Sequence, residues 1–286
     1  MICHHVARRA AACAVLFGVL VALPSASAQQ AKDPGQTLRE LQALAWQHGP
    51  AEGSIGGIAT IKVRNGQAFL DGPNTRRFLE LNQNPPRDNH YTLAGQDSDW
   101  FAIFSFENSG YVKDDEKLDP EALLKSLQDS DKPSNEERAR LGMPPIHTAG
   151  WSVPPHYDTS GKRLEWGLRL RAESGREVIN YTVRLLGRRG VTHATLVSDS
   201  QGLDRNIADF KASLTDFNFA PGERYAEFKA GDRMAEYGLG ALILGGAAAV
   251  AVKTGFGKVI LKFIVFGLIA FGGAAAAFFR KFFRRG

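Results

Sequence analysis

Two groups of ionisable residues could do chemistry in this chain, and the first offers ligands for a metal ion. Its members share carboxylate or imidazole side chains and come from one acidic stretch and a later proline-rich segment: Asp114, Asp115, Glu116, His147, His156 and Asp158. Oxygen and imidazole ligands of this kind bind divalent cations in proteins. Their spacing matches no standard metal motif, so a solvated acidic turn beside a helix N-terminus is the alternative interpretation.

The second group is a row of charged residues on one face of a predicted sheet. Glu165, Arg184 and His193 are expected side by side across three strands, with Arg169 and Arg171 on the same face. An arginine offers a fixed, bidentate cation and a histidine titrates near neutral pH, so this row could bind an anion or transfer protons. A cross-strand charge ladder with a purely structural role is the alternative.

Other catalytic classes have little support in the sequence. The chain contains no Gly-x-Ser-x-Gly elbow, no Ser-x-x-Lys pair and no phosphate-binding glycine loop. Residues 154–158 place His156 and Asp158 on a stiff proline connector, which indicates either a functional loop or a structural brace. We therefore predict no cofactor, and the sequence favours a non-enzymatic protein while leaving an enzyme open.

Helices and strands with clear end signals surround the acidic stretch. Asn65-Gly66 between two apolar runs is a strong hairpin signal, which predicts paired strands at residues 58–63 and 67–70. An aromatic run predicts a buried strand at residues 100–106. Apolar spacing and capping residues predict helices at residues 37–48, 74–81, 120–128 and 134–141.

The second group depends on an antiparallel meander. Apolar residues alternate without a gap over residues 164–172, which indicates a strand with one buried face. A two-residue turn at 174–175 sets Glu165 opposite Arg184. A second two-residue turn sets Arg184 opposite His193, so the three residues are predicted to share the polar face.

A helix at residues 203–214 and a short strand at 217–219 complete an α+β pattern, an antiparallel meander with packed helices. This order of elements is similar to the PsbP-like sandwich, a likeness of fold that implies no function. The predicted regions follow in order: signal peptide 1–28, N-terminal α/β part 29–142, meander plus helix 143–220, linker 221–236, and membrane anchor with basic tail 237–286. An ordered connector with a short strand near residues 147–151 is expected to open the meander region.

The N-terminal 28 residues have the features of a secretory signal peptide. Two arginines precede an apolar core, and residues 26–28 form a small-x-small cleavage site. An uncleaved anchor is the alternative. Both cysteines, Cys3 and Cys13, lie in this segment, so a mature chain from residue 29 has no cysteine for a disulfide or a metal site.

The C-terminal apolar run is predicted to anchor the chain in a membrane, as one transmembrane helix or as a helical hairpin. Residues 259–279 reach roughly 31 Å at ~1.5 Å per residue, which is enough to span a bilayer. Residues 237–252 are shorter and would form a short span, a re-entrant helix or an interfacial helix. Rows of small residues in these segments would allow a homo-oligomer through close helix packing.

Positive charge is concentrated at the two ends of the chain. Of 35 Lys+Arg residues, two lie in the signal peptide and seven after residue 252, whereas all 30 acidic residues lie between, so residues 29–252 carry a net charge of about −4. A mildly acidic body is poorly suited to phosphate backbones, so we predict no nucleic-acid partner. The tail residues Arg280, Lys281, Arg284 and Arg285 are expected to meet anionic lipid of the bilayer.

Several motifs resemble a bacterial family of uncharacterised membrane-anchored proteins, a domain-of-unknown-function family. The matching segments are residues 46–50, 68–72, 110–116, 135–138, 154–158, 180–190, 222–227 and 235–239. The resemblance covers nearly all of the mature chain. It implies a cell-envelope location and a membrane anchor, and it implies no activity.

Together these features predict a membrane-anchored interaction or binding module. We expect it at the bacterial inner membrane with its folded domain in the periplasm. One alternative is an envelope hydrolase or metal-dependent enzyme that uses the acidic and histidine loop residues. Another is a self-associating helical hairpin with a regulatory domain.

Overall fold

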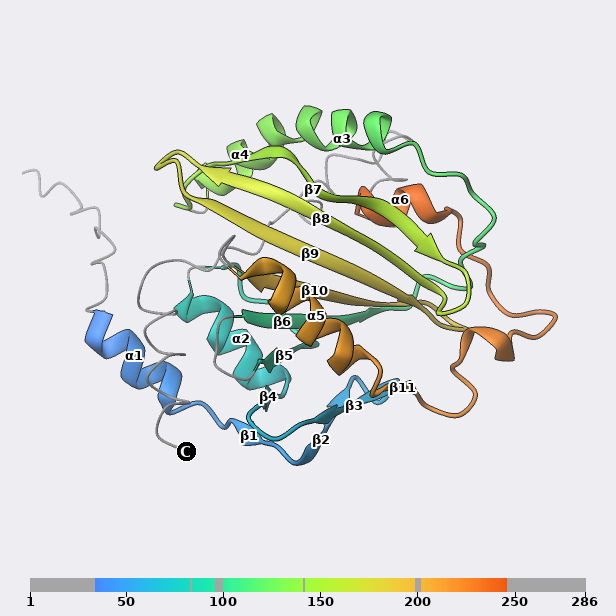
Figure 1. The fold of residues 1–286 in the computed structure, drawn as a ribbon, viewed down its shortest axis with the longest axis horizontal. Helices are drawn as coiled ribbons and strands as arrows, with labels where there is room; N and C mark the ends of the chain where they lie inside the picture. Colours follow the sequence, from blue (N-terminus) through green and yellow to red (C-terminus); the bar gives the residue numbers. More distant parts are fainter. Residues whose placement is uncertain (1–33, 83, 96–99, 141, 199–201, 246–286) are drawn as a thin grey trace, which may run out of the picture. The chain divides into compact units, whose positions relative to one another are not determined.

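Residues 34–82, 84–95, 100–140, 142–198 and 202–245 are described by the computed structural model of this chain (Figure 1). The predicted signal peptide, the span at residues 259–279 and the basic tail lie outside the described residues. Within the described ranges, no helix is long and apolar enough to cross a membrane.

An eight-stranded antiparallel sheet lies at the centre of the described domain. Its strands, in spatial order, are β1 (Gln47–His48), β4 (Ala68–Leu70), β5 (His90–Ala94), β6 (Trp100–Glu107), β10 (Val191–Ser198), β9 (Glu177–Leu186), β8 (Arg163–Ala172) and β7 (Ile146–Asp158). Because β6 pairs with β10, the two regions predicted at residues 29–142 and 143–220 share one sheet. The predicted α+β class, an antiparallel sheet with packed helices, is confirmed for the described part of the chain.

A small sheet and one helix cover one face of the large sheet, which we call the sandwich face. The small sheet has the order β11-β3-β2 and is formed by β2 (Ala51–Ile55), β3 (Ala59–Val63) and β11 (Phe217–Phe219). The helix is α5 (Leu203–Leu214), which crosses in front of the large sheet in Figure 1. Ile61, Tyr181 and Phe210 are buried in the core between these layers.

The opposite face, which we call the helical face, packs against helices from separate parts of the chain. These are α2 (Gly72–Leu81), α3 (Pro120–Asp129) and α6 (Leu239–Ile243). Their buried residues Phe78, Leu123 and Leu239 share one core with Trp166 of β8. The helices α1 (Pro34–Gln42) and α4 (Asp131–Arg140) and the 3-10 helix η2 (Tyr225–Glu227) also belong to the domain.

Burial of both faces explains an error in the predicted meander register. The turn between β8 and β9 contains three residues, Glu173 to Gly175, because Gly175 takes a left-handed φ of +79° and its N–H donates to Ala172 O at 2.9 Å. The pairing is therefore one residue away from the prediction, with Glu165 opposite Val183. Since each face has its own apolar core, alternation in β8 alone did not specify which residues of β9 share its side of the sheet. The predicted register of β9 with β10 is confirmed.

The predicted hairpin around Asn65-Gly66 is wrong, although the turn itself forms. Gln67 N–H donates to Arg64 O at 2.9 Å, and Gly66 has a left-handed φ of +79°. The two flanking strands then enter different sheets, because β3 pairs with β2 and β11, whereas β4 pairs with β1 and β5. The turn chemistry was predicted correctly, and the partners of the strands were not.

Two further predictions are corrected around β7. The helix predicted to open at a Ser134 capping box begins earlier, at Asp131, whose carboxylate accepts hydrogen bonds from the backbone N–H and hydroxyl of Thr148 at 2.7 and 2.8 Å. The expected connector at residues 143–158 is mostly strand, since β7 runs for 13 residues with register irregularities. Its place at the edge of the sheet tolerates Pro154 and Pro155, which cannot donate to a ladder.

Other elements were predicted correctly from local signals. The carboxylate of Asp119 caps α3, which has a proline in its first turn, as predicted. The helix predicted to begin at residue 74 begins two residues earlier, at Gly72, because the carboxylate of Asp71 caps α2. The strand β6, the helix α5 and the strand β11 match their predicted places. The helix predicted at residues 37–48 is wrong in its second half, because α1 ends at Gln42 and residues 47 and 48 form β1. The strands β2 and β5 were not predicted.

Candidate functional site

The charged row predicted on the meander is divided between the two faces of the large sheet. Glu165 lies on the sandwich face, because β8 is shifted by one residue relative to the prediction. Arg184 lies opposite His193 on the helical face, as predicted. Each half forms a polar cluster with residues that the sequence pattern did not single out.

The sandwich-face cluster consists of Glu165, Tyr181, Lys211 and Arg163. The side chain of Glu165 is 1% exposed, and its Oε2 accepts hydrogen bonds from Tyr181 Oη at 2.5 Å and Lys211 Nζ at 2.7 Å. Arg163 Nε lies 3.7 Å from Glu165 Oε1. Burial opposes ionisation of Glu165, but the hydrogen bonds from Lys211 and Tyr181 outweigh it and lower the pKa of the carboxyl.

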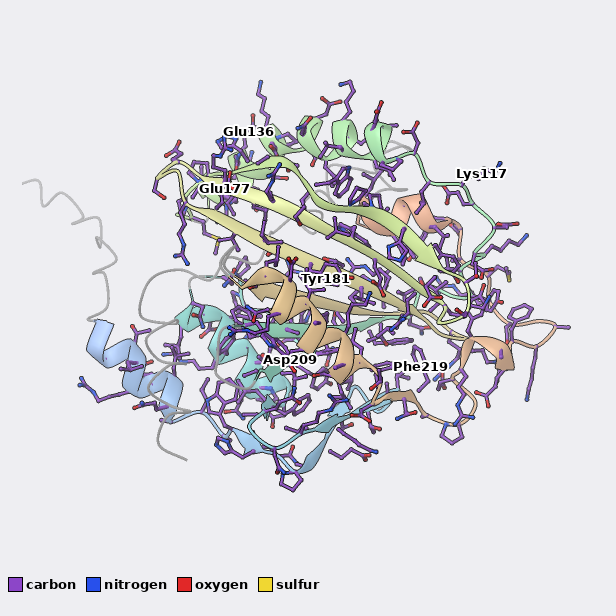
Figure 2. The ribbon with its side chains drawn as sticks, in the orientation of Figure 1. Lys117, Glu136, Glu177, Tyr181, Asp209 and Phe219 are labelled. Atoms are coloured by element: carbon purple, nitrogen blue, oxygen red, sulfur yellow. The ribbon has the colours of Figure 1, made fainter. Side chains whose placement is uncertain are left out.

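This cluster ties a helix to the sheet. Lys211 lies on α5 and Glu165 on β8, so their ion pair joins elements that are 46 residues apart in the chain. Tyr181 lies beside α5, and Asp209 of the same helix accepts a hydrogen bond from Trp100 Nε1 at 2.9 Å (Figure 2). These bonds fix α5 on the sandwich face.

The helical-face cluster consists of Arg184, His193, Glu107 and Tyr237. His193 Nε2 lies 3.1 Å from Glu107 Oε2, and Tyr237 Oη donates to Glu107 Oε1 at 2.5 Å. The guanidinium of Arg184 stacks over Trp166, with Cζ 5.0 Å from the ring centre. Arg184 Nε and Nη1 are enclosed and have no hydrogen-bond partner among the described residues.

Burial governs the ionisation of the helical-face cluster. It lowers the pKa of Arg184 to about 10. Burial and the charge of Arg184 lower the pKa of His193 to about 4, against the opposing influence of Glu107. Burial and the hydrogen bond to Glu107 raise the pKa of Tyr237. At neutral pH Arg184 is charged, His193 is neutral and Tyr237 is a donor, so the cluster has no group poised to exchange protons near pH 7.

Tyr237 belongs to a segment, residues 221–245, that is held against the domain at several points. Arg188 Nε and Nη2 donate to Asp232 at 2.6 and 2.7 Å. Tyr225 Oη donates to Val112 O at 2.9 Å. Residues 221–236, predicted as a linker, thus follow the surface of the domain. The first residues of the predicted anchor lie in its core, because Leu239 and Leu242 of α6 are each 0% exposed.

Two of the candidate metal ligands are already engaged by donors of the protein. Asp114 Oδ2 accepts hydrogen bonds from Tyr157 Oη and Lys162 Nζ, each at 2.8 Å. Burial opposes ionisation of Asp114, but these bonds prevail and lower its pKa. Asp158 accepts hydrogen bonds from Ser160 Oγ at 2.7 Å and Arg163 Nη2 at 2.9 Å, which hold its pKa well below the usual range.

The remaining candidates do not complete a metal site. Asp115, His147 and His156 are exposed. Glu116 Oε2 accepts a hydrogen bond from the N–H of Gly240 at 3.0 Å, so it serves the start of α6. Within the described residues, no three His, Cys, Asp or Glu side chains are gathered closely enough to hold a metal ion. The predicted ligand set is therefore dispersed over the surface.

The other arginines of the predicted row do not join Arg184. Arg169 and Arg171 occupy alternate positions with Glu165 on β8, and both are exposed. Arg171 Nη2 pairs with Glu177 Oε1 at 2.7 Å. The expected ligand face is thus neither continuous nor concentrated at one point.

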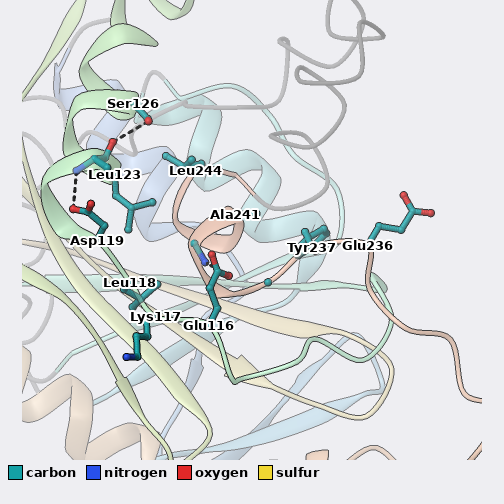
Figure 3. Close-up of a pocket in the computed structure, with 13 residues that line it drawn as sticks. Glu116, Lys117, Leu118, Asp119, Leu123, Ser126, Glu236, Tyr237, Ala241 and Leu244 are labelled. Carbon is teal, nitrogen blue, oxygen red and sulfur yellow. Dashed lines mark hydrogen bonds between the residues drawn. The ribbon is translucent and has the colours of Figure 1, made fainter.

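A pocket of about 510 Å³ lies between α3, the loop before it and the segment that contains α6 (Figure 3). The polar residues around it include Glu116, Lys117, Asp119 and Glu236, and its apolar wall includes Leu123 and Leu244. Glu116 is the one candidate metal ligand that reaches this pocket. Asp114, Asp115, His156 and Asp158, which an enzyme site would need to unite, are not among its lining residues.

Sequence reasoning missed Glu107, Tyr237 and the pocket. Glu107 is the last residue of an aromatic strand, and its contact with His193 depends on the long-range pairing of β6 with β10. Tyr237 was assigned to the membrane anchor because the residues after it are apolar. A polar aromatic residue at the start of that run was the available signal for a contact with protein.

A comparison with curated proteins gives no match. Among solved structures, the chain is similar to cyanobacterial PsbP from Synechocystis sp. PCC 6803, with 10% sequence identity, a TM-score of 0.33, and coverage of 61% of this chain and 91% of that one. The family described as "Protein of unknown function (DUF2167)" matches residues 47–276. This match covers most of the sequence and confirms the resemblance to an uncharacterised family. The chain therefore belongs to the DUF2167 family.

Proposed function

We propose that this chain is a membrane-tethered binding module whose folded domain lies in the periplasm of a bacterial cell and whose anchor crosses the inner membrane once. The sequence features behind this proposal are the N-terminal signal and the apolar run at residues 259–279. We infer a single crossing because α6 is buried in the core of the domain.

A hairpin anchor would require residues 237–252 to enter lipid. Leu239, Leu242 and Ile243 are 0%, 0% and 5% exposed, so their apolar surface is already removed from water by protein. The nine residues that remain, 244–252, would reach roughly 14 Å as a helix, which is less than half of the ~30 Å hydrocarbon core. One crossing at residues 259–279 then sends the basic tail to the cytoplasmic side, as the positive-inside rule favours.

A binding role is supported by how the ionisable residues are used. Asp114, Asp158 and Glu165 are held by Lys, Arg, Tyr and Ser donors of the same domain, and His193 is neutral and enclosed. Groups held in this way stabilise the fold. The pocket beside α6 is a concave surface of the described residues that is suited to a partner.

Fractionation and thiol labelling test this proposal. We expect the full chain to stay in the membrane pellet after alkaline carbonate extraction. Ser174 lies on the exposed turn between β8 and β9, so a Ser174→Cys variant reports the location of the domain. A membrane-impermeant maleimide added to spheroplasts should label it as fully as in lysed cells. Extraction of the chain by carbonate, or labelling only after lysis, would refute the tether or the location.

A further inference from the structure

The pocket beside α6 has the size and wall chemistry of a site for a hydrocarbon chain. Its volume of about 510 Å³ falls within the range of pockets that hold small molecules. Leu118, Leu123, Ala241 and Leu244 supply apolar wall from both sides, α3 with its preceding loop on one and the α6 segment on the other. A ligand enclosed there would be removed from water mainly along apolar surface.

The rim of the pocket is negatively charged. Among the described lining residues, Glu116, Asp119 and Glu236 are acidic, whereas Lys117 alone is cationic. Figure 3 shows the Glu116 carboxylate directed to the α6 side of the pocket, whereas Lys117 and the Glu236 carboxylate are directed away from it. A positively charged group at the rim would meet complementary charge, and a phosphate without a cation would meet repulsion.

The position of the pocket in the chain indicates where such a ligand would come from. Leu244 lies in its wall, and the described residues end one position later. The sequence that follows is the apolar run of the proposed anchor. On the proposed function, this wall is the part of the domain that leads directly to the bilayer, where amphiphiles are concentrated.

We propose that this pocket takes the hydrocarbon chain of a lipid that has a primary ammonium group in its head, with the ammonium at the rim near Glu116. This inference rests on the proposed function only for the source of the lipid. Recognition itself needs the pocket alone. The site distinguishes lipids by the charge of the head group and accepts the chain through its apolar wall.

Photo-crosslinking of the purified full chain in maltoside micelles tests the site. The probes are lysophosphatidylethanolamine and lysophosphatidylglycerol, which carry the same diazirine-labelled chain and differ in the head group. We expect adducts on peptides that contain residues 118–126 and 241–244, at least fivefold more with the ethanolamine lipid. Adducts confined to other peptides, equal labelling by the two lipids, or no uptake because residues 246–286 fill the pocket themselves would overturn the proposal.

Matched variants separate the pocket from the rest of the surface. Ala122 and Glu121 are adjacent exposed residues of α3, and only Ala122 lines the pocket. Ala122→Trp should reduce labelling at least fivefold, and Glu121→Trp should leave it unchanged. Glu116→Gln should reduce the preference for the ethanolamine lipid, whereas Glu173→Gln on the distant turn should not. Wild-type labelling of Ala122→Trp would refute the site. Because the assay measures lipid binding in micelles, it tests the pocket even if carbonate extraction shows that the chain is not held in the membrane.

Discussion

The two polar clusters lie on opposite faces of the same sheet and use their charges differently. In the sandwich-face cluster, Glu165 is buried and accepts hydrogen bonds from Tyr181 and Lys211. In the helical-face cluster, Arg184 is held by stacking on Trp166 and by the charge of Glu107, and two of its enclosed nitrogens have no hydrogen-bond partner among the described residues. In the sandwich-face cluster, Glu165 Oε1 and Arg163 Nε also lack a hydrogen-bond partner among the described residues. The clusters therefore differ in how the central charge is held, by direct hydrogen bonds from Lys211 and Tyr181 at Glu165 and by stacking and the charge of Glu107 at Arg184.

The two clusters also attach different elements to the sheet. Lys211 and Glu165 fix α5, an element of the folded domain, in a single arrangement. Glu107 and Tyr237 join the sheet to the segment that leads toward the proposed anchor. We infer that the sandwich-face cluster serves the stability of the fold, whereas the helical-face cluster and α6 set where the domain ends and the membrane segment begins.

The largest expected effect concerns α6. Leu242 is 0% exposed, so Leu242→Ala should leave a cavity and lower the free energy of unfolding by about 3 kcal/mol. Leu244→Ala, at a half-buried position in the same segment, should cost less than about 1 kcal/mol. Chemical denaturation of the full chain in micelles, followed by tryptophan fluorescence, measures both. Equal and small effects would show that α6 is not part of the core.

The next effect is a pH dependence specific to the helical face. The pKa of His193 is about 4 in the folded state and near 6.5 when unfolded, so the unfolded chain binds the proton first as pH falls. Stability is therefore expected to decrease from pH 6.5 toward pH 4, by on the order of 3 kcal/mol from this residue. His193→Gln should flatten that part of the profile of unfolding free energy against pH. An unchanged slope would contradict a neutral His193 with an enclosed Nε2.

A smaller effect is expected on the sandwich face. Glu165→Gln keeps the shape of the side chain and removes the charge that Lys211 and Tyr181 face, so we expect a loss of about 2 kcal/mol. Amide exchange should accelerate in α5 and remain unchanged in α6. Glu173→Gln, on the exposed turn, is the control. Faster exchange in α6 instead of α5 would mean that the two clusters do not act on separate elements.

The smallest effect is expected for Tyr237→Phe. This change removes only the hydroxyl that donates to Glu107, and it should lower the free energy of unfolding by about 1 kcal/mol. Hydrogen exchange should accelerate in residues 239–243 and not in α5. Tyr91→Phe, whose ring stacks on Phe69 on the sandwich face, is a control for loss of a tyrosine hydroxyl. Unchanged exchange in α6 would show that Tyr237 does not help to attach this segment to the domain.

Local signals in the sequence were sufficient to predict features that depend on a single helix or strand. Asp119 and Pro120 predicted the start of α3, because a carboxylate before a proline-containing first turn satisfies free N–H groups. The alternation over residues 164–172 correctly predicted the strand β8. Both signals act within a few residues and need no knowledge of the partner.

Pairing partners and registers could not be predicted in the same way. The strand after Ala172 can start after two or three turn residues, and with both faces buried the apolar pattern did not select between them. That single residue moved Glu165 to the opposite face from Arg184. The contact of Glu107 with His193, and the burial of α6, depend on segments more than 80 residues apart. Of the predicted charged row, only the pairing of Arg184 with His193 was therefore predicted correctly.

The side of the membrane on which the tail lies tests the central claim, that α6 belongs to the domain and the anchor crosses once. Cys3 and Cys13 lie in the predicted signal peptide, so Arg285→Cys would give the mature chain a single thiol. With a membrane-impermeant maleimide on intact spheroplasts, we expect no labelling of Arg285→Cys and full labelling after lysis. Labelling of Arg285→Cys in intact spheroplasts to the extent seen for Ser174→Cys would contradict the account, because it would place both ends of the anchor on one side.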